Sequence, residues 1–317
     1  MRQSSVDPRT YVPGGRRGNG RDLPSVQPGM TDNTPADPAE PLRYAAFTAD
    51  PAGGNPAGVV LDATALGDRQ QLALAAELGY SETAFLTPVP DQPRSRTVRY
   101  FSPRLEVPFC GHATIAAAVA LGELIGPGEL LFETKAGPVP VAVERTAGGE
   151  FTATLTSVPP YVEEADAADL AEALDALGWK AGELDPQLPP MIAYAGARHL
   201  VIGAATRARL ADLDYDFEAL AALMRRLDLV TLQLVWEQDA ATFHVRDPFP
   251  VGGIVEDPAT GAAAAAFGAY LRHLRHLETA RLTLHQGEDL GRPGLLTVDL
   301  TEGEVRVRVT GRAVRIP

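Results

Sequence analysis

The segment 108–124 reads Pro-Phe-Cys-Gly-His-Ala-Thr-Ile-Ala-Ala-Ala-Val-Ala-Leu-Gly-Glu-Leu, a glycine turn with three polar side chains that opens a nearly continuous apolar run. The pattern predicts a helix without a polar face before Glu123, so we expect it to be buried on almost every side. The first N–H groups of a helix lack intrahelical partners and lie at the positive end of its dipole. This stretch therefore predicts a buried helix N-terminus that can hold a carboxylate.

A second copy of this arrangement occupies 256–271, which reads Glu-Asp-Pro-Ala-Thr-Gly-Ala-Ala-Ala-Ala-Ala-Phe-Gly-Ala-Tyr-Leu. The segment 242–250 in front of it matches 97–103 in front of the first copy, and 196–203 is a weaker partner of 54–61. The copies are about 145 residues apart, which is too long for a solenoid repeat and suits a duplicated domain. We expect two similar halves that share a single site at their junction.

The composition restricts the class of protein. The 317 residues are 45% hydrophobic and 22% charged, as in a soluble globular chain long enough for two domains. The formal net charge of −13 argues against nucleic acid as a partner. The single cysteine leaves no intramolecular disulfide. No segment approaches the roughly 18 apolar residues of a membrane span, so we expect a cytoplasmic protein that has no membrane partner.

Local patterns divide the chain into a tail and two domains. Residues 1–40 are polar and rich in Gly and Pro, which predicts a disordered tail. We assign 41–160 to an N-terminal domain, 161–300 to a C-terminal domain, and 301–317 to strands that return to the N-terminal domain. Many short strands around one apolar helix in each half predict an α+β fold.

Besides the two central helices, the sequence predicts helices at 68–78 and 217–227. The predicted strands lie at 44–47, 57–61, 80–87, 98–102, 130–133, 139–143, 151–155, 197–202, 231–237, 242–245, 281–286, 295–300, 304–309 and 313–316.

Four side chains are candidates for chemistry. Glu82 lies among apolar residues, where partial desolvation suits a general base or acid, although a solvent-facing strand residue fits the same pattern. His112 begins a helix, whose dipole favours a neutral imidazole, with a local cap as the alternative. Asp257 precedes a proline, so helix capping alone explains it. Cys110 is either a thiol with a lowered pKa that acts as base or nucleophile, or a small buried residue.

Other catalytic signatures are missing from the sequence. It contains no G-x-S-x-G, Walker loop, H-E-x-x-H, or G-x-G-x-x-G after a strand. His273 and His276 share a helix face, but neighbouring arginines indicate a solvated surface instead of a metal site. We therefore expect neither a cofactor nor a metal ion.

Five motifs in one order resemble the PhzF-like isomerase family of phenazine biosynthesis over about residues 42–317. They are Phe47-Thr48 with Gly54-Asn55-Pro56, Ser81-Glu82-Thr83-Ala84-Phe85, Cys110-Gly111-His112-Ala113-Thr114, Glu256-Asp257-Pro258-Ala259-Thr260-Gly261, and Gln286-Gly287 with Gly291-Arg292-Pro293. The resemblance implies a diaminopimelate epimerase-like fold, in which two similar domains each wrap a β-barrel-like sheet around a central helix. It also implies a homodimer with the active site in the cleft between the domains.

The resemblance further implies cofactor-independent proton transfer on a small cyclic or amino carboxylic acid. Its acid/base glutamate falls on Glu82, and two further catalytic residues fall on His112 and Asp257. The residues expected to bind substrate are Asn55, Cys110, Gly111, Thr260, Gly261 and Ala262.

Two features leave alternatives open. Many phenazine-type members have Ser where this chain has Ala262, so dihydro-hydroxyanthranilate is not established as the substrate. Related epimerases have a catalytic thiol at the position of Cys110, so an epimerase or racemase that uses Cys110 and Asp257 is the second hypothesis. Their other catalytic thiol has no counterpart here, because Cys110 is the only cysteine. A binding protein that retains the fold without catalysis is the third.

Overall fold

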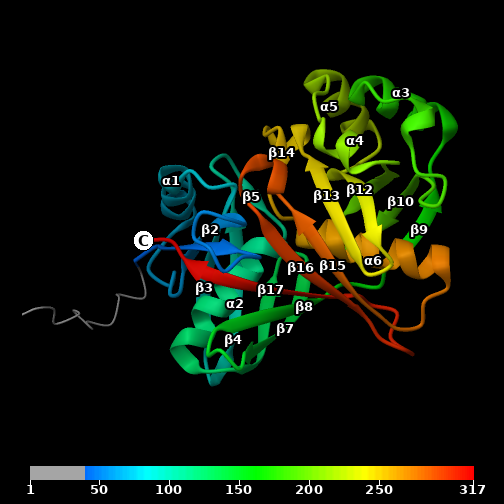
Figure 1. The fold of residues 1–317 in the computed structure, drawn as a ribbon. Coiled ribbons are helices and arrows are strands. Elements are labelled where there is room, and N and C mark those ends of the chain that lie inside the picture. Colours follow the sequence, from blue (N-terminus) through cyan, green and yellow to red (C-terminus); the bar gives the residue numbers. More distant parts are fainter. Residues whose placement is uncertain (1–39) are drawn as a thin grey trace, which may run out of the picture. The chain divides into compact units, whose positions relative to one another are not determined.

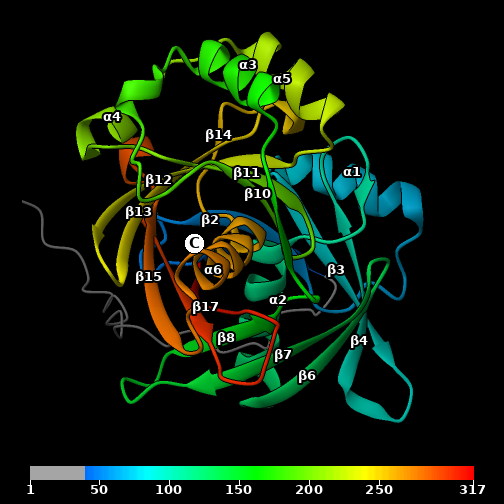
Figure 2. The ribbon, with the colours of Figure 1, turned by 90° about the vertical axis from the view of Figure 1, so that its right-hand side faces the viewer.

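The computed structural model describes residues 40–317, which belong to one compact unit (Figure 1). The disorder predicted for residues 1–40 therefore lies outside the described residues, except for Glu40. Within the described part of the chain, strands surround two central helices, α2 (Gly111–Ile125) and α6 (Gly261–Arg275). Figure 2 shows these two helices near the centre with the strands around them. The α+β fold class predicted from the sequence is confirmed.

The first half is a closed eight-stranded barrel around α2. In order around the barrel, its strands are β1 (Leu42–Ala46), β2 (Asn55–Val60), β3 (Glu82–Val89), β4 (Gln92–Phe101), β6 (Gly128–Thr134), β7 (Gly137–Arg145), β8 (Phe151–Thr156) and β17 (Arg308–Arg315). Every neighbouring pair is hydrogen-bonded, including β17 with β1, so this sheet has no free edge.

The second half places a similar sheet around α6, but among the described residues its pairing runs from β9 to β17 without closing a ring. Its strands are β9 (Tyr161–Glu164), β10 (Met191–Tyr194), β11 (Arg198–Gly203), β12 (Thr231–Asp239), β13 (Thr242–Pro248), β15 (Ala280–Gln286) and β16 (Gly294–Leu300), with β17 again adjacent. Outside the sheets lie α1 (Asp68–Leu78) in the first half and α3 (Ala167–Leu177), α4 (Arg207–Ala211) and α5 (Phe217–Arg226) in the second. Short 3-10 turns span Ala181–Glu183, Pro250–Gly252 and Glu288–Leu290.

The strand pairing shows why each half needs its central helix. β4 and β6 are parallel neighbours, as are β13 and β15. Parallel strands require a crossover connection, and α2 and α6 are these crossovers. Each is entered through a two-residue strand, β5 (Glu106–Val107) or β14 (Glu256–Asp257). The duplication in the sequence is therefore a duplication of the strand–helix–strand unit.

Burial of α2 follows from its composition. Every residue from His112 to Gly122 is buried, in agreement with the predicted absence of a polar face. Small side chains also let the sheets approach closely. A methyl group added at Gly122 would lie 2.6 Å from Val143 Cγ1, and one added at Gly268 in α6 would lie 2.7 Å from Val298 Cγ1.

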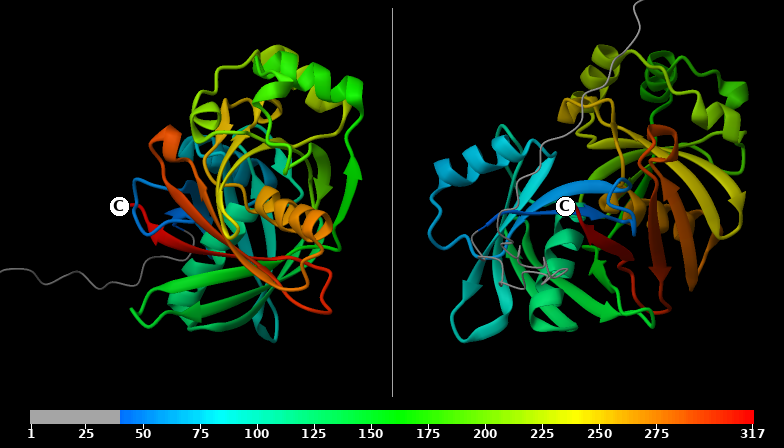
Figure 3. Two further views of the ribbon diagram at one scale, coloured as in Figure 1. Left: turned by 45° about the vertical axis from the view of Figure 1, so that its right-hand side comes forward. Right: turned by 60° about the vertical axis from the view of Figure 1, so that its left-hand side comes forward.

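The last strand differs from its prediction. The sequence suggested separate strands at 304–309 and 313–316, but the structure has one strand, β17, over Arg308–Arg315. It stays continuous because it has three partners: β16, β8 and β1. Figure 3 shows β17, in red, between the green strands of the first half and the orange strands of the second. The domain boundaries at 160 and 300 stay predictions.

Replacing Gly268 by Ala tests the close packing of α6. We expect Gly268→Ala to lower the free energy of unfolding by about 1–3 kcal/mol, although Ala is the better helix former by roughly 1 kcal/mol. The added methyl would also lie 3.0 Å from Val307 Cγ1. Gly182→Ala is the matched control, because no atom lies within 4 Å of its added methyl. Urea unfolding of both variants measures the difference, and equal stabilities would contradict the packing argument.

Candidate active site

The N-termini of α2 and α6 meet at two glycines. A Cβ atom placed on Gly111 would lie 3.5 Å from the backbone nitrogen of Ala262 and 3.6 Å from the Cα of Gly261. A Cβ atom on Gly261 would lie 3.1 Å from the ring of Phe47, which is fully buried. The positive ends of two helix dipoles therefore face each other, an arrangement that favours negative charge between them.

Three of the predicted residues cluster beside the start of α2. Glu82 opens β3, Cys110 is the N-cap of α2, and His112 is its second residue. The Cys110 Sγ donates to Glu82 Oε2 at 3.5 Å, and His112 Nε2 lies 3.5 Å from the same oxygen. Glu82 keeps 15% of its side-chain surface exposed, whereas His112 keeps only 5%. The carboxylate is therefore the group in this cluster that faces an open side.

The structure decides between the two interpretations of Cys110. Burial raises the pKa of its thiol well above the usual range, which contradicts a thiol with a lowered pKa and agrees with the small buried residue. The nearby carboxylate of Glu82 acts in the same direction. The thiol is therefore protonated near neutral pH, and it can donate a proton but is a poor base.

Asp257 lies on the other side of the junction, where both of its carboxylate oxygens accept hydrogen bonds. Its Oδ2 accepts a hydrogen bond from Thr260 Oγ1, and its Oδ1 accepts one from Asn55 Nδ2 at 2.8 Å. Gln286 Nε2 donates to the backbone oxygen of Asp257 at 2.9 Å and to Thr260 Oγ1 at 3.0 Å. Burial raises the pKa of Asp257 from 3.8 to about 6. This carboxyl group therefore changes its charge close to physiological pH.

Asn55 connects the two groups of residues. Its amide nitrogen lies 2.8 Å from Asp257 Oδ1, 3.1 Å from the backbone oxygen of Ala259, and 3.1 Å from His112 Nδ1. The side chain is almost completely buried, with 1% of the residue exposed. The structure thus brings Asn55, Glu82, Cys110, His112 and Asp257 into one connected network. Gly111, Thr260, Gly261 and Ala262 form the adjoining helix starts.

Two residues of this region were not identified from the sequence as site residues. Gln286, known only as part of a family motif, holds the N-terminal loop of α6 by accepting from Thr260 N at 2.9 Å. Asp247 is fully buried opposite Asp257 in the β13–β14 pair, and burial raises its pKa well above the usual range. β13 also contains His244 and Arg246, so the sequence carries no signal that singles out Asp247.

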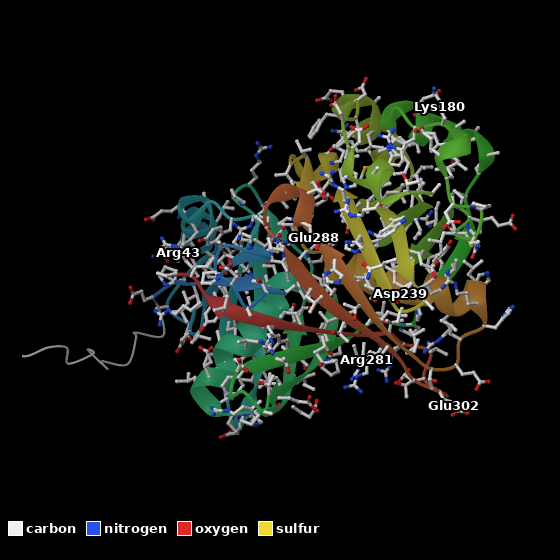
Figure 4. All side chains as sticks on the ribbon, in the orientation of Figure 1. Arg43, Lys180, Asp239, Arg281, Glu288 and Glu302 are labelled. Carbon is white, nitrogen blue, oxygen red and sulfur yellow. The ribbon has the colours of Figure 1, made fainter. Side chains whose placement is uncertain are left out.

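A buried ion pair supports β14. Arg246 Nη2 and Nε contact the carboxylate of Glu256, and Arg246 Nη1 donates to the backbone oxygen of Ala211 at 2.7 Å. By contrast, the charged side chains labelled in Figure 4, among them Lys180 and Glu302, are exposed and lie at the periphery. The interior charges are therefore concentrated around the helix junction and its supports.

The donor set of Glu82, Cys110 and His112 deserves a test as a metal centre, because its ligand atoms lie within 4.8 Å of one another. A metal-bound histidine normally donates its other ring N–H to a carboxylate, carbonyl or water. Here His112 Nε2 faces Glu82, and the other nitrogen, Nδ1, faces the amide donor of Asn55. The surroundings of His112 thus do not fit a metal ligand.

Comparison with known proteins identifies the class. The family described as "Phenazine biosynthesis-like protein" matches residues 44–316. An uncharacterized isomerase, YfhB of Bacillus subtilis (strain 168), is 31% identical over 87% of this chain and 96% of its own length. The trans-2,3-dihydro-3-hydroxyanthranilate isomerase of Pseudomonas chlororaphis is 30% identical over 85% of this chain and 94% of its own length. The crystal structure of a PhzF-family protein from Bacillus anthracis superposes with a TM-score of 0.79 at 25% identity, covering 87% of this chain and 96% of that one.

The fold and these relatives show that the protein is an isomerase. The chain belongs to the phenazine biosynthesis-like, or PhzF, family. Among its described residues, no helix combines the length and apolar character needed to cross a bilayer. The homodimer and the individual site roles stay predictions.

The raised pKa of Asp257 gives a pH-dependent stability. Between pH ~4 and ~6 the folded protein holds a proton that the unfolded chain releases, so stability falls as pH rises through this window. Asp257→Asn removes this loss of unfolding free energy above pH ~6, which is on the order of 2–3 kcal/mol. Urea unfolding of both proteins at several pH values isolates the effect from Asp247 and Glu256, whose raised pKa values act in the same direction. Parallel stability curves for the two proteins would contradict it.

Proposed function

We propose that this protein moves a proton, and with it a double bond, on a small cyclic or amino carboxylic acid by acid/base catalysis at Glu82. The observation that carries the proposal is the position of the partly exposed Glu82 carboxylate beside two buried helix N-termini. The dihydro-hydroxyanthranilate isomerase named among the relatives acts on a substrate of this kind. Ala262 at the start of α6 leaves the exact acid open.

The proposed step conserves atoms and electrons. The ionised Glu82 takes a proton from a carbon next to a double bond, and the C–H electron pair moves into the conjugated system. The protonated Glu82 then returns the proton to a different carbon of that system, and the double bond ends at a new position. No electrons leave the substrate, so the step needs neither a redox cofactor nor a metal.

The surroundings support the charge that develops in this step. The substrate carboxylate and the delocalised electron pair are both negative, and the N–H groups at the starts of α2 and α6 can stabilise them. Asp257 is poised between its charged and neutral forms, because burial raises its pKa to about 6. In its neutral form it can donate a hydrogen bond to the substrate without repelling it.

A second candidate is an epimerase that inverts a stereocentre with Cys110 and Asp257. The position of Cys110 Sγ, 3.5 Å from Glu82 Oε2 and 3.4 Å from His112 Nδ1, favours this alternative. Because the thiol is held protonated by burial, Cys110 would donate the proton and Asp257 would remove one from the opposite face. The isomerase should lose its activity when Glu82 is replaced, and the epimerase when Cys110 is replaced.

Proton NMR in deuterated buffer tests both candidates with a panel of unsaturated cyclic and amino carboxylic acids. We expect wild type to catalyse exchange or double-bond migration, and Glu82→Gln to lose about 10²–10⁴-fold in rate, the usual contribution of a general base. Glu77→Gln is the matched control, because Glu77 is an exposed residue of α1 and its loss removes the same charge.

Cys110→Ala separates the mechanisms. Retained exchange in Cys110→Ala together with its loss in Glu82→Gln supports the isomerase. Deuterium incorporated at a stereocentre by wild type but not by Cys110→Ala supports the epimerase. If Glu82→Gln is as active as wild type on a turned-over substrate, the proposed role of Glu82 is wrong.

A further inference from the structure

We propose that Asn55 is a positioning residue that keeps His112 in the tautomer protonated at Nε2, so that the imidazole N–H faces Ser81 Oγ and the neighbouring carboxylate of Glu82. The catalytic consequence of this assignment depends on the proposed function, but the tautomer itself does not. Asn55 lies in β2 of the first half, and two of its three partners, Asp257 and Ala259, belong to the second half.

The orientation of the Asn55 amide follows from its partners. A backbone carbonyl can only accept a hydrogen bond, so the amide atom 3.1 Å from the oxygen of Ala259 is the nitrogen. The contact with Asp257 Oδ1 at 2.8 Å requires the same orientation when this carboxylate is ionised. The atom that faces His112 Nδ1 is therefore a nitrogen whose two hydrogens leave it without acceptor capacity.

This orientation restricts the His112 ring. A hydrogen on Nδ1 would point at the Asn55 N–H₂ group 3.1 Å away, and neither group could accept from the other. An unprotonated Nδ1 can accept a hydrogen from Asn55, whose two N–H hydrogens are shared among His112, Asp257 and Ala259. It can also accept from the Cys110 thiol at 3.4 Å, when the S–H turns from Glu82 to the ring. In the neutral ring the proton is then on Nε2, which lies 3.5 Å from Glu82 Oε2 and 3.3 Å from Ser81 Oγ.

The backbone beside Asn55 is fixed by the second half. Arg292 donates to the backbone oxygens of Gly53 at 2.7 Å and Gly54 at 2.9 Å. Gly54 N donates back to the oxygen of Pro293 at 3.0 Å, and Gly54 has a φ of 52°, a conformation that favours glycine. The second half therefore holds the backbone in front of Asn55, and turning the side chain away from His112 would break its own contacts with Asp257 and Ala259.

The direct test is the protonation pattern of the His112 ring in wild type. Imidazole ¹⁵N NMR distinguishes the two nitrogens, and His112→Gln assigns the signal among the six histidines of the chain. We expect Nδ1 to give the signal of an unprotonated nitrogen and Nε2 that of a protonated one at neutral pH. The opposite pattern, with the proton on Nδ1 towards Cys110, would overturn the proposal whatever the activity.

Asn55→Asp tests the cause, because it keeps the shape of the side chain and replaces the donor by an acceptor. We expect the proton of His112 to move to Nδ1 and the exchange rate to fall at least about 100-fold, mainly in kcat. The freed Nε2 can now join Glu82 and Cys110 around a metal ion. Co²⁺ should therefore give a thiolate-to-cobalt charge-transfer band with Asn55→Asp and not with wild type.

Gln286→Glu is the matched control. It makes the same amide-to-acid change in the network around Asp257, but Gln286 donates to Asp257 O and Thr260 and not to His112. We expect this variant to keep the Nε2–H tautomer even if its activity falls.

Each result bears on one proposal. An unchanged tautomer in a folded Asn55→Asp protein would overturn the role of Asn55. If Asn55→Asp does not fold, Asn55→Leu takes its place, and it should show both His112 tautomers. Full activity in Glu82→Gln would instead remove the proposed function and leave the tautomer assignment intact.

Discussion

The contact between the two helix N-termini at Gly111 and Gly261 is the constraint on which the structure depends. Two positive dipole ends can face each other only when the residues between them are small and negative charge is close by. The first residue of each helix is glycine, which meets the requirement for small residues. The carboxylates of Glu82 and Asp257 supply the negative charge. Asn55 fixes their relative position, because it contacts Asp257 directly and His112, which faces Glu82. The requirement that stabilises the junction therefore also gathers these carboxylates beside the two helix starts.

Much of the fold could be predicted from the sequence because its strongest signals are local. The apolar runs of α2 and α6 and the glycine after Leu78 mark helices without reference to the rest of the chain, and α1 begins and ends at the predicted residues. The error at β17 has a long-range cause. Residues 304–307, in which valine alternates with charged residues, were predicted to be part of a strand. The pairing of Arg308–Arg315 with three other strands sets the limits of β17 instead.

The sequence predicted those site residues that belong to helix starts and short motifs. Glu82, Cys110, His112 and Asp257 were candidates from the sequence, and the structure brings them together with Asn55. The bridging contacts of Asn55, the support by Gln286 and the burial of Asp247 depend on how the two halves dock. The direction in which a side chain points across such a junction does not follow from the spacing of apolar and polar residues in the sequence. The choice between the two interpretations of Cys110 also depends on this docking, because burial raises the pKa of the thiol.

The sharing of β17 has a consequence for how the protein is made. Chains usually fold domain by domain from the N-terminus while they leave the ribosome. The first barrel is encoded early, yet β17 closes it between β8 and β1, and β17 follows every strand of the second half in the chain. Until that strand emerges, the edges of β1 and β8 have no partner there and can pair with other nascent chains. Synthesis of this protein therefore depends on a period in which an open sheet must be kept from aggregating.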